Sequence, residues 1–236
     1  MGQLTNYVPH DAKLVIHASD RRFRIIVAGR RFGKTLCLAA DIINRAHNFG
    51  GTYGWICPTY LTGEHGLEAI RDIAGDFVEI SGKTPAVVKV PTVDGGTAKI
   101  WFLSADNPDS IRGYGFEGIV VDEAASIPTD VWTYAIRPTI AHTMGWAVLM
   151  STPKGHNWFF DMFTRGLDKA ETEYQSFRFR SIDNKTFPIA EWEEAQRTLP
   201  SDVFRQEYLG DFLEDSAGVF HNVDDCTFEG EGVQMG

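Results

Sequence analysis

The segment from Ala28 to Thr35 has the residue types and spacing of a phosphate-binding loop. It reads AGRRFGKT and follows the pattern G-x-x-x-x-G-K-[ST], with Ala28 in place of the first glycine. Backbone N–H groups from Gly33 onward can surround phosphates, the Lys34 ammonium can reach the β and γ oxygens, and the Thr35 hydroxyl can ligate Mg²⁺. A strand-to-helix turn with a chance GKT is the plainer alternative. The pattern predicts binding of a nucleoside triphosphate with Mg²⁺.

Two adjacent carboxylates, Asp122 and Glu123, could complete this site. They follow the apolar run IVV. If that run is a strand, Asp122 would hold the Mg²⁺ shell, and Glu123 could polarise a water for in-line attack on the γ-phosphate. Adjacent acids are also common on solvated surfaces and at helix N-caps, so the prediction depends on their pairing with Lys34. Because nucleotide kinases need no water-activating carboxylate here, Glu123 favours a hydrolytic enzyme.

Ser151 and Thr152 follow another apolar run, WAVLM. Hydroxyl groups at a strand end could sense the γ-phosphate or the attacking water. The same residues, followed by Pro153 and Gly155, are also typical of an ordinary turn. The spacing alone favours neither interpretation.

Hydrophobic periodicity predicts the elements that would position these residues. A buried strand is expected directly before the loop and a helix directly after it, which is the opening of an α/β unit. Parallel strands should end near Asp122 and Ser151, since their carboxyl ends would form the site. The turn Asp94-Gly95-Gly96 predicts a β-hairpin, and the sequence after Asp183 predicts a small helical appendage packed on the sheet. The expected strands lie within residues 22–29, 53–57, 86–90, 98–103, 118–125, 146–153 and 174–181, and the expected helices are residues 34–47, 68–77, 190–199 and 202–213.

Composition and charge limit the class of protein. The chain has 236 residues, of which 43% are hydrophobic and 23% charged, so disordered, collagenous and coiled-coil classes are excluded. The net charge of −10 predicts no general affinity for nucleic acid or an anionic membrane, and any contact with DNA must be local. Most of the charges in a local arginine cluster are interpreted as a solvated face. The cluster consists of Arg21, Arg22, Arg24, Arg30 and Arg31.

The sequence shows no membrane or export signal. No apolar run approaches the ~18 residues that span a bilayer, and the first residues contain neither the charged nor the apolar region of a signal peptide. The three cysteines, Cys37, Cys57 and Cys226, have no disulfide-framework or zinc-site spacing. The expectation is a protein of a reducing cytosol that is neither secreted nor inserted in a membrane.

Taken together, the motifs at three strand ends resemble one family, the ATPase domain of the large terminase subunit that packages DNA into the capsids of tailed phages. AGRRFGKT resembles that family's deviant Walker A, IVVDEAA its Walker B with the catalytic glutamate, and STPKGHNWFFDMF its coupling motif. WICPTY, SIRGYGFEGIVVDEA and FRQEYLGDFLEDSAGVF extend the resemblance over most of the chain.

The resemblance implies an α/β P-loop NTPase fold with a mostly parallel central sheet, of the additional-strand, catalytic-glutamate type, and a small helical C-terminal subdomain. The expected units are an ATPase core (1–182), a helical linker or lid (183–215) and a tail (216–236) that leads to an absent nuclease domain. Terminase large subunits carry an RNase H-like nuclease with clustered acids, whereas Asp224 and Asp225 are interpreted as a linker pair. The chain is expected to be an isolated ATPase domain or a fragment that does not cleave DNA.

The resemblance also implies residue roles. Arg30 would be a cis arginine on the phosphates, and Arg112 would be an arginine finger offered to a neighbouring subunit. A solvent-exposed loop arginine is the plainer interpretation of Arg112. Tyr7 and Pro9 resemble an adenine-side motif, in which Lys13 stands where glutamine is expected and leaves base selectivity open. The expected catalytic residues are Arg30, Lys34, Arg112 and Glu123, the metal ligands are Thr35 and Asp122, and the nucleotide-binding residues are Tyr7, Pro9, Lys13, Gly29, Arg30, Arg31, Gly33, Lys34, Thr35, Leu36, Ser151 and Thr152.

The implied activity is hydrolysis of ATP with Mg²⁺ that translocates double-stranded DNA into a procapsid. The implied partners are double-stranded DNA, a portal protein, a small terminase subunit and further copies of the chain in a ring, expected to be a pentamer, with a monomer as the state in isolation. The place of action would be the procapsid portal in the host cytoplasm, with no membrane involved. Two alternatives stay open: a DNA or RNA helicase-like translocase with the same core, and a nucleotide-gated binding module without turnover, against which Glu123 argues.

Overall fold

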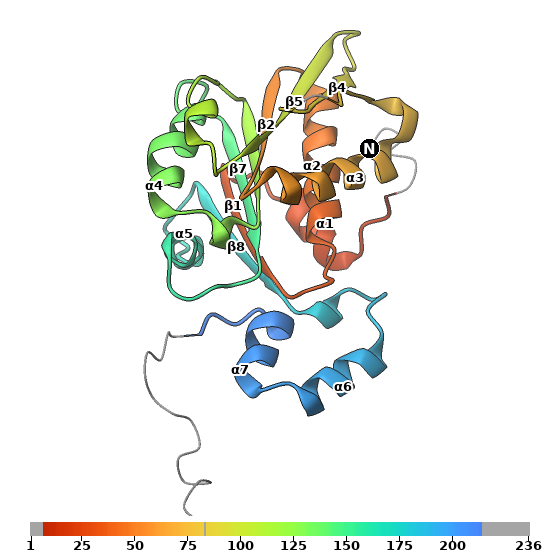
Figure 1. Ribbon diagram of the computed structural model, residues 1–236, viewed down its shortest axis with the longest axis vertical. Helices are drawn as coiled ribbons and strands as arrows, with labels where there is room; N and C mark the ends of the chain where they lie inside the picture. The colour runs from red at the N-terminus through yellow and green to blue at the C-terminus, as the bar shows by residue number, and fades with distance from the viewer. Residues whose placement is uncertain (1–6, 83, 214–236) are drawn as a thin grey trace, which may run out of the picture.

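The computed structural model describes residues 7–82 and 84–213, which fold around one eight-stranded β-sheet (Figure 1). The strand order across the sheet is β3-β4-β5-β2-β6-β7-β1-β8. The strands from β5 across to β8 run parallel, whereas β3 and β4 are antiparallel additions at one edge. The strands are β1 (Phe23–Ala28), β2 (Thr52–Cys57), β3 (Glu79–Ile80), β4 (Val87–Pro91), β5 (Thr97–Ser104), β6 (Gly118–Asp122), β7 (Trp146–Ser151) and β8 (Tyr174–Phe179).

β7 lies between β1, which precedes the glycine loop, and β6, which ends at Asp122. β7 pairs with β1 on one side and with β6 on the other. Because parallel strands end at the same edge of a sheet, Gly29, Glu123 and Thr152 follow β1, β6 and β7 at one carboxyl edge. The expected mostly parallel sheet with an additional strand is confirmed.

Helices and short turns bury both faces of the sheet. In β1, Ile26 and Ala28 belong to the core under α1, α2 and α3, while Phe23, Ile25 and Val27 belong to the core under α4 and α5 (Figure 1). The alternation has the period of two that a strand buried on both faces requires. The helices are α1 (Asp11–Ala18), α2 (Lys34–Phe49), α3 (Tyr60–Ala74), α4 (Thr129–Val131), α5 (Trp158–Arg165), α6 (Ile189–Thr198) and α7 (Ser201–Phe204), with short helices η1 (Gly75–Phe77), η2 (Pro108–Ser110), η3 (Ala124–Ser126), η4 (Trp132–Ile136), η5 (Arg137–Ile140), η6 (Ser181–Asp183) and η7 (Arg205–Leu209).

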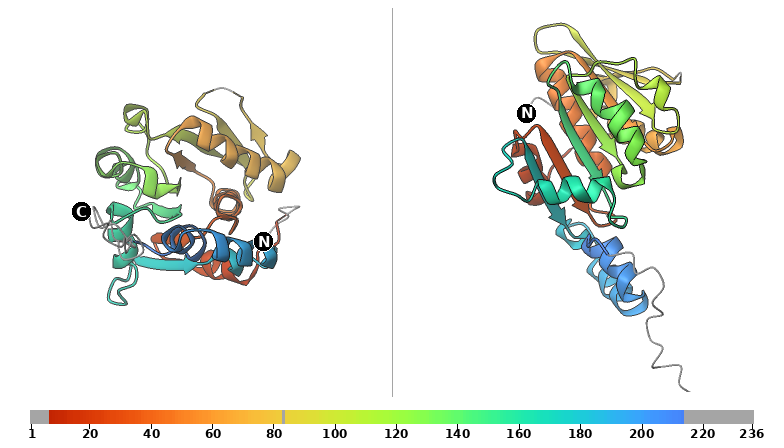
Figure 2. Two further views of the ribbon diagram at one scale, coloured as in Figure 1. Left: turned by 60° about the horizontal axis from the view of Figure 1, so that its bottom comes forward. Right: turned by 90° about the vertical axis from the view of Figure 1, so that its left-hand side faces the viewer.

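A helical unit formed by α6, α7 and η7 projects from the carboxyl edge, beyond β8 (Figure 2). Aromatic rings hold it together: Trp192 and Phe204 lie 5.0 Å apart between ring centroids, and Phe204 stacks on Tyr208 at 5.3 Å. The predicted helical appendage is therefore present. Its limits as a domain stay a prediction, and the predicted tail, with Asp224, Asp225 and Cys226, lies outside the described residues.

Helix α3 corrects one prediction. A helix was expected over residues 68–77, but α3 begins at Tyr60, where Thr59 caps it by accepting from the Thr62 backbone N–H. Gly63 and Gly66 lie in its first turns, and a Cβ on either would come within 2.8 Å of a side-chain atom below, the Cys57 sulfur or the Trp55 ring. Glycine lowers helix propensity, so the pattern hid this part of the helix, whereas the structure uses the glycines for close packing.

Among the remaining elements, one prediction is confirmed and some elements were not predicted. The predicted hairpin is confirmed, since β4 and β5 pair antiparallel around the Asp94 turn. The structure adds α1, α4 and β3, which the sequence pattern did not predict, and the helix predicted over residues 202–213 ends at Leu209, as α7 followed by η7. Within the described residues, none of the helices combines the length and the apolar character that a membrane crossing requires.

A buried ionic cluster fastens α2 to the sheet and to α1. Asp41 of α2 accepts two hydrogen bonds from Arg24 of β1, at 3.0 and 2.7 Å, and one from Arg45 at 3.2 Å. His17 of α1 lies 3.3 Å from the same carboxylate. Arg24 is 0% exposed, so this member of the arginine cluster is not part of a solvated face.

Candidate active site

The glycine loop between β1 and α2 presents free backbone N–H groups. Gly33 is the N-cap of α2 with φ of 87°, a left-handed conformation that glycine adopts without strain. No side chain caps the first turn of α2, so its N–H groups remain available to an anion. The loop thus has the backbone geometry that phosphate binding needs.

Lys34 is held at the end of the neighbouring strand. Its ammonium donates to the carbonyls of Ala28 at 3.1 Å and Gly29 at 3.3 Å, and to Thr152 Oγ1 at 3.0 Å. Burial lowers the pKa of Lys34, while the charges of Glu123 and Asp122 act in the opposite direction. The structure therefore joins Lys34, Thr152 and the two predicted carboxylates in one cluster.

Asp122 is a buried carboxylate with little compensating positive charge. It is 5% exposed, and burial, followed by the neighbouring charge of Glu123, raises the pKa of Asp122 to about 7. Lys34 and a hydrogen bond from Thr35 act to lower it. The hydroxyl of Thr35 and the carboxylate of Asp122, predicted as metal ligands, are thus neighbours.

Glu123 turns away from the strand into the site. Its φ of 51° lies in the left-handed region, which is uncommon for a residue with a side chain and is found often at functional sites. Its backbone N–H donates to Asp122 Oδ1 at 3.0 Å, and Ser151 Oγ donates to Glu123 Oε2 at 3.3 Å. The two hydroxyl residues at the end of β7 therefore contact two different charged groups: Ser151 contacts Glu123, and Thr152 contacts Lys34.

A cavity of about 770 Å³, called the loop cavity below, opens over this cluster. It brings together eight of the predicted site residues, which are Arg30, Arg31, Gly33, Lys34, Thr35, Leu36, Glu123 and Thr152. It also has walls that sequence reasoning missed, namely His65, Ser126, Pro153, Lys154, Gln206 and Glu207. His65 comes from the first turns of α3, which the sequence pattern did not predict because they contain Gly63 and Gly66. Gln206 and Glu207 come from the helical unit.

The helical unit contacts the glycine loop directly. Arg30 forms an ion pair with Glu207, and the Arg30 backbone N–H donates to the Glu207 carbonyl at 2.7 Å. Asn184, in the segment that leads into the helical unit, donates from Nδ2 to the Arg31 carbonyl at 2.9 Å. A Cβ on Gly29 would lie 2.6 Å from the Tyr208 carbonyl, so only glycine allows this approach. A change at the loop can therefore be transmitted to the helical unit.

Five of the predicted nucleotide-binding residues do not line the loop cavity: Gly29 and Ser151, whose chain neighbours Arg30 and Thr152 do line it, and Tyr7, Pro9 and Lys13. Tyr7 contacts His17, with the hydroxyl 2.8 Å from Nε2, and neither Tyr7 nor Pro9 lines the cavity. Lys13 is 6% exposed, and its ammonium lies 2.7 Å from the position that a Cβ on Gly33 would occupy. Lys13 thus supports the glycine loop from the side of α1.

Arg112 also lies away from the loop cavity of its own chain. It is in the segment after β5, and β2, β6 and β7 separate β5 from β1 in the sheet. Its side chain is 56% exposed and pairs with Asp109 at 3.0 Å. A Cβ added to Gly113 or Gly115 would meet nothing within 4 Å. The segment is accessible to another molecule.

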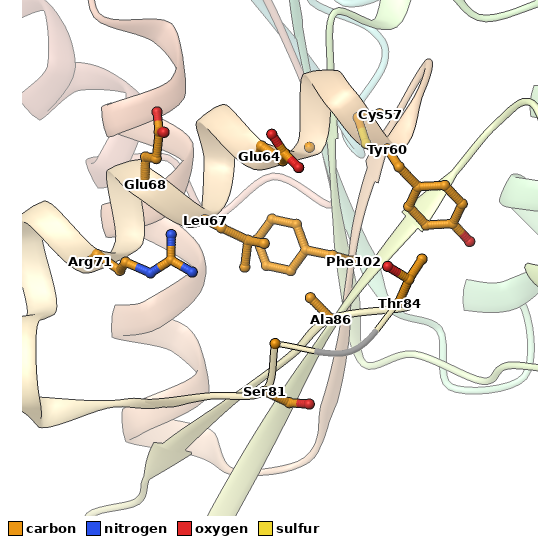
Figure 3. A pocket seen from close by; sticks show the side chains of 12 residues that line it. Cys57, Tyr60, Glu64, Leu67, Glu68, Arg71, Ser81, Thr84, Ala86 and Phe102 are labelled. Atoms are coloured by element: carbon orange, nitrogen blue, oxygen red, sulfur yellow. The ribbon is translucent and has the colours of Figure 1, made fainter.

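A smaller cavity of about 230 Å³ lies on another side of α3, between that helix and β5 (Figure 3). Leu67 of α3 and Phe102 of β5 supply apolar walls, and Glu64, Glu68 and Arg71 supply charge. None of the predicted site residues lines it, so the described structure gathers the predicted chemistry at the loop cavity instead.

The comparison with known families agrees with the geometry. A sequence model for the family described as terminase large subunit, T4likevirus-type, N-terminal, matches residues 25–228. The chain belongs to the terminase large-subunit family. This terminase chain is 31% identical to the terminase large subunit of Thermus virus P23-45, over 94% of this chain and 52% of that protein. It therefore spans about half the length of that curated relative.

Solved structures of large terminases have the same fold as this chain. The large terminase ATPase domain of Thermus phage P74-26 superposes with a TM-score of 0.73 and 29% identity, covering 89% of this chain and 96% of that domain. The large terminase of another thermophilic bacteriophage gives a TM-score of 0.73 over 88% of this chain and 54% of that one, and at 17% identity it supports the fold alone. The expected P-loop ATPase fold is confirmed.

Proposed function

We propose that this terminase chain is the ATPase motor of viral DNA packaging, which hydrolyses ATP with Mg²⁺ to move double-stranded DNA into a procapsid. The observation that carries the proposal is the loop cavity, which joins Lys34 and Thr35 to Glu123. The similarity to a domain named as a large terminase ATPase domain supports hydrolysis. The second large terminase of the same fold, from the other thermophilic bacteriophage, has been solved with ADP and with ATP-gamma-S.

The donor set at the end of β6 fits Mg²⁺. A carboxylate and a hydroxyl are oxygen ligands of the kind that Mg²⁺ prefers, and Thr35 and Asp122 are neighbours. Burial raises the pKa of Asp122 because little positive charge compensates it, so a cation would be favoured there. When bound, Mg²⁺ would neutralise charge on the β- and γ-phosphates.

The protein groups would then divide the reaction among them. Lys34 would exchange its loop carbonyl partners for phosphate oxygens, as Arg30 would exchange Glu207. Glu123 would orient a water and accept its proton as the water oxygen attacks the γ-phosphorus and ADP leaves. Ser151 and Thr152, which hold Glu123 and Lys34, would respond to loss of the γ-phosphate.

The remaining site assignments are part of the same proposal. Gly29, Arg31 and Leu36 would complete the nucleotide site on the loop side. A base-side role for Tyr7, Pro9 and Lys13 stays a prediction. The absence of DNA cleavage by this chain also stays a prediction.

Arg112 would complete the site of a neighbouring copy. Its exposed position, on a segment that three strands of the sheet separate from β1, favours contact in trans over contact with its own cavity. The chain would then act in a ring, expected to be a pentamer, at the procapsid portal in the host cytoplasm. Its partners there would be double-stranded DNA, the portal protein and the small terminase subunit.

The test is steady-state phosphate release with ATP and Mg²⁺, measured with and without double-stranded DNA over a range of protein concentrations. The motor predicts stimulation by DNA and a specific activity that rises with concentration. Binding of ATP without turnover under all these conditions would support the nucleotide-gated binding module instead. Stimulation by single strands rather than duplex would favour the helicase-like alternative.

Mixing two inactive variants tests the role of Arg112 in trans. Arg112→Ala should bind ATP normally yet lose about 10³-fold in hydrolysis, the effect of a missing arginine finger. A mixture with Glu123→Ala contains interfaces that pair an intact Glu123 with an intact Arg112, so activity should reappear. A mixture that assembles but stays as inactive as its components would place Arg112 in a cis or structural role.

A further inference from the structure

The edge at which the parallel strands begin, called the amino edge here, presents exposed apolar side chains. Because β2, β5, β7 and β8 run parallel, the segments that precede them all reach this edge. Each of the four segments carries one large apolar side chain that is 59 to 77% exposed. These side chains are Phe49, Val93, Met144 and Leu167. The helical unit and the loop cavity lie at the opposite edge, so these residues lie away from the nucleotide site (Figure 1).

Backbone hydrogen bonds fasten these segments to one another along the amino edge. Each bond runs from an N–H of one segment to a carbonyl of a neighbouring one, at 2.8 to 3.2 Å, and the pairs are Val93 to His47, Glu117 to Thr52, Trp146 to Glu117, Ala147 to Arg22, and Phe23 to Glu173. β5 and β8 are five strand intervals apart in the sheet, or about 24 Å at ~4.8 Å per interval. A span of this size fits a protein interface of about 800 Å² per partner. A partner can bind such a fixed surface without first ordering it, which lowers the entropic cost of binding.

Met144 is presented by a turn in a left-handed conformation. Its φ of 52° is uncommon for a residue with a side chain and is found often at functional sites. The carbonyl of the next residue, Gly145, accepts a hydrogen bond from Arg22 Nε at 3.1 Å. The turn is therefore held in place while the Met144 side chain stays exposed to solvent.

Arg137 adds a cation that has no anionic partner in the described part of the chain. Its guanidinium and that of Arg22 each lie 5.0 Å from the centre of the Phe23 ring. Arg22 pairs with Glu173 at 3.1 Å, whereas Arg137 forms no ion pair or side-chain hydrogen bond with a described residue. Burial, followed by the charge of Arg22, lowers the pKa of Arg137. A carboxylate from outside the chain would offset both effects.

The apolar side chains and the unpaired cation together favour a protein partner over DNA. Single exposed apolar residues are normal on a protein surface, but a set gathered on one face marks an interaction site. Met and Arg are among the residues enriched at protein interfaces, where apolar area is buried at the centre. Contacts to a DNA backbone are made instead by polar groups to phosphates and sugars, which would leave these apolar side chains in water.

We propose that the amino-edge surface, formed by Phe49, Val93, Met144, Leu167 and Arg137, binds a protein whose contact surface is acidic and partly apolar. Apolar side chains of the partner cover the four exposed apolar residues, and a carboxylate of the partner pairs with Arg137. This inference rests on the proposed function, which names the portal protein and the small terminase subunit as partners and so supplies the two probes. It gives the edge opposite the nucleotide site a role in assembly of the motor.

The experiment measures binding of the purified full chain to the portal protein and to the small terminase subunit. Biolayer interferometry gives the affinity for each, and the wild type should bind at least one of the two. Met144→Ser and Arg137→Glu should each weaken that binding about tenfold or more, the loss expected for a residue that carries much of the binding energy. Phe49→Ser tests a second segment of the surface, so the result does not depend on the folding of one variant.

Matched controls make similar changes away from the amino-edge surface. Val15→Ser alters an exposed apolar side chain of α1, and Arg197→Glu reverses an exposed cation of α6. Both should bind the probes as the wild type does. None of these variants changes a residue of the proposed nucleotide site, so ATP hydrolysis without a partner should stay at the wild-type rate in all of them.

The outcomes separate this inference from the proposed function. A wild type that hydrolyses ATP but binds neither probe would overturn the amino-edge surface alone. Surface variants that bind as tightly as the wild type would overturn it too, as would controls that lose as much affinity as the surface variants. A wild type without ATP hydrolysis would contradict the proposed function, whereas a loss of probe binding confined to the surface variants would still support this inference.

Two further measurements test other occupants of the surface. Fluorescence anisotropy with a double-stranded oligonucleotide should give the same affinity for the wild type and for Arg137→Glu. A loss of duplex binding in this variant, with probe binding unchanged, would assign the surface to DNA instead. Sedimentation velocity should show the same association state for the wild type and for Met144→Ser. A wild-type assembly that Met144→Ser dissociates would assign the surface to a second copy of the chain and overturn the proposal.

Discussion

Two carboxylates in this molecule are equally buried but opposite in their electrostatic environment. Asp41 and Asp122 are each 5% exposed. Burial alone would raise the pKa of Asp41, but the charge of Arg24, with hydrogen bonds from His17 and Arg24, outweighs it and holds that pKa well below its usual range. Burial and Glu123 raise the pKa of Asp122 to about 7, because Lys34 compensates its charge only in part.

The difference separates a structural charge from a functional one. Asp41 has protein partners on three sides, so its charge is fully used in joining α1, α2 and β1. Asp122 faces another carboxylate, and the nearby ammonium of Lys34 is hydrogen-bonded to two carbonyls and to Thr152. A buried acid without enough cationic partners is suited to receive a cation from outside the chain.

The largest effect is expected when the structural carboxylate is neutralised. Asp41→Asn would leave the guanidinium of Arg24, which is 0% exposed, without its anion. Breaking a buried ion pair on one side costs about 3–5 kcal/mol of unfolding free energy. Urea unfolding followed by circular dichroism measures the loss, with Asp130→Asn at an exposed position as the control. A loss below about 1 kcal/mol would show that Arg24 finds another partner.

The next effect concerns turnover at the functional carboxylates. Glu123→Ala should lower the hydrolysis rate about 10²-fold or more, the size expected for a lost general base, while ATP affinity stays within several-fold. Lys34→Ala should weaken ATP binding itself, because its ammonium would contact the phosphates. Calorimetric binding and phosphate release, measured on the same preparations, separate the two effects. Turnover that is unchanged in Glu123→Ala would remove the water-activating role from this residue.

The sequence was sufficient for those parts of the site that are local in the chain. The glycine loop, the Asp122–Glu123 pair and the Ser151–Thr152 pair each occupy consecutive positions at the end of an apolar run. A parallel sheet brings such strand ends to one edge whatever the loops between them do. The fold class and the central cluster could therefore be predicted before any contact was known.

The parts that escaped prediction depend on long-range packing. Glu207 forms an ion pair with Arg30, which lies 177 positions away in the chain, and hydrophobic periodicity cannot predict such a pairing. His65 was missed because Gly63 and Gly66 have a low helix propensity, so the pattern did not predict the first turns of α3. The structure needs these glycines for close packing. Arg24 lies three positions after the exposed Arg21, and only the partner Asp41 on α2 explains its burial.

Acid should weaken the contribution of Asp41, the structural carboxylate, to the stability of the fold in a defined pH range. The folded-state pKa of Asp41 is depressed, so its contribution to stability is present above the unfolded pKa near ~4 and is lost as pH falls below that value. The difference in unfolding free energy between wild type and Asp41→Asn should therefore shrink by up to about 1.4 kcal/mol per pH unit below pH ~4. Urea unfolding at several pH values measures it. A difference that stays constant with pH would mean that folding does not lower the pKa of Asp41.

The smallest effect is expected for stability when the functional carboxylate is neutralised. Asp122→Asn keeps the shape of the side chain, and its amide oxygen can still accept the Glu123 backbone N–H, now at 3.0 Å from Asp122 Oδ1. The substitution also removes a buried negative charge that faces Glu123, so without metal the unfolding free energy should stay within about 0.5 kcal/mol of the wild type or rise.

The same variant should lose the extra stabilisation that Mg²⁺ adds to that of the nucleotide. Ligand binding to the native state stabilises it by about 2.7 kcal/mol at a concentration of 100 times Kd, so Mg²⁺ with ADP should raise the Tm of the wild type. In Asp122→Asn the extra rise that Mg²⁺ adds to that of ADP alone should be lost, because the proposed metal ligand is neutral. Thermal unfolding in EDTA, with ADP and with Mg²⁺ plus ADP measures all three states. A loss of several kcal/mol in EDTA, as expected for Asp41→Asn, would instead make Asp122 a structural charge and end the contrast between the two carboxylates.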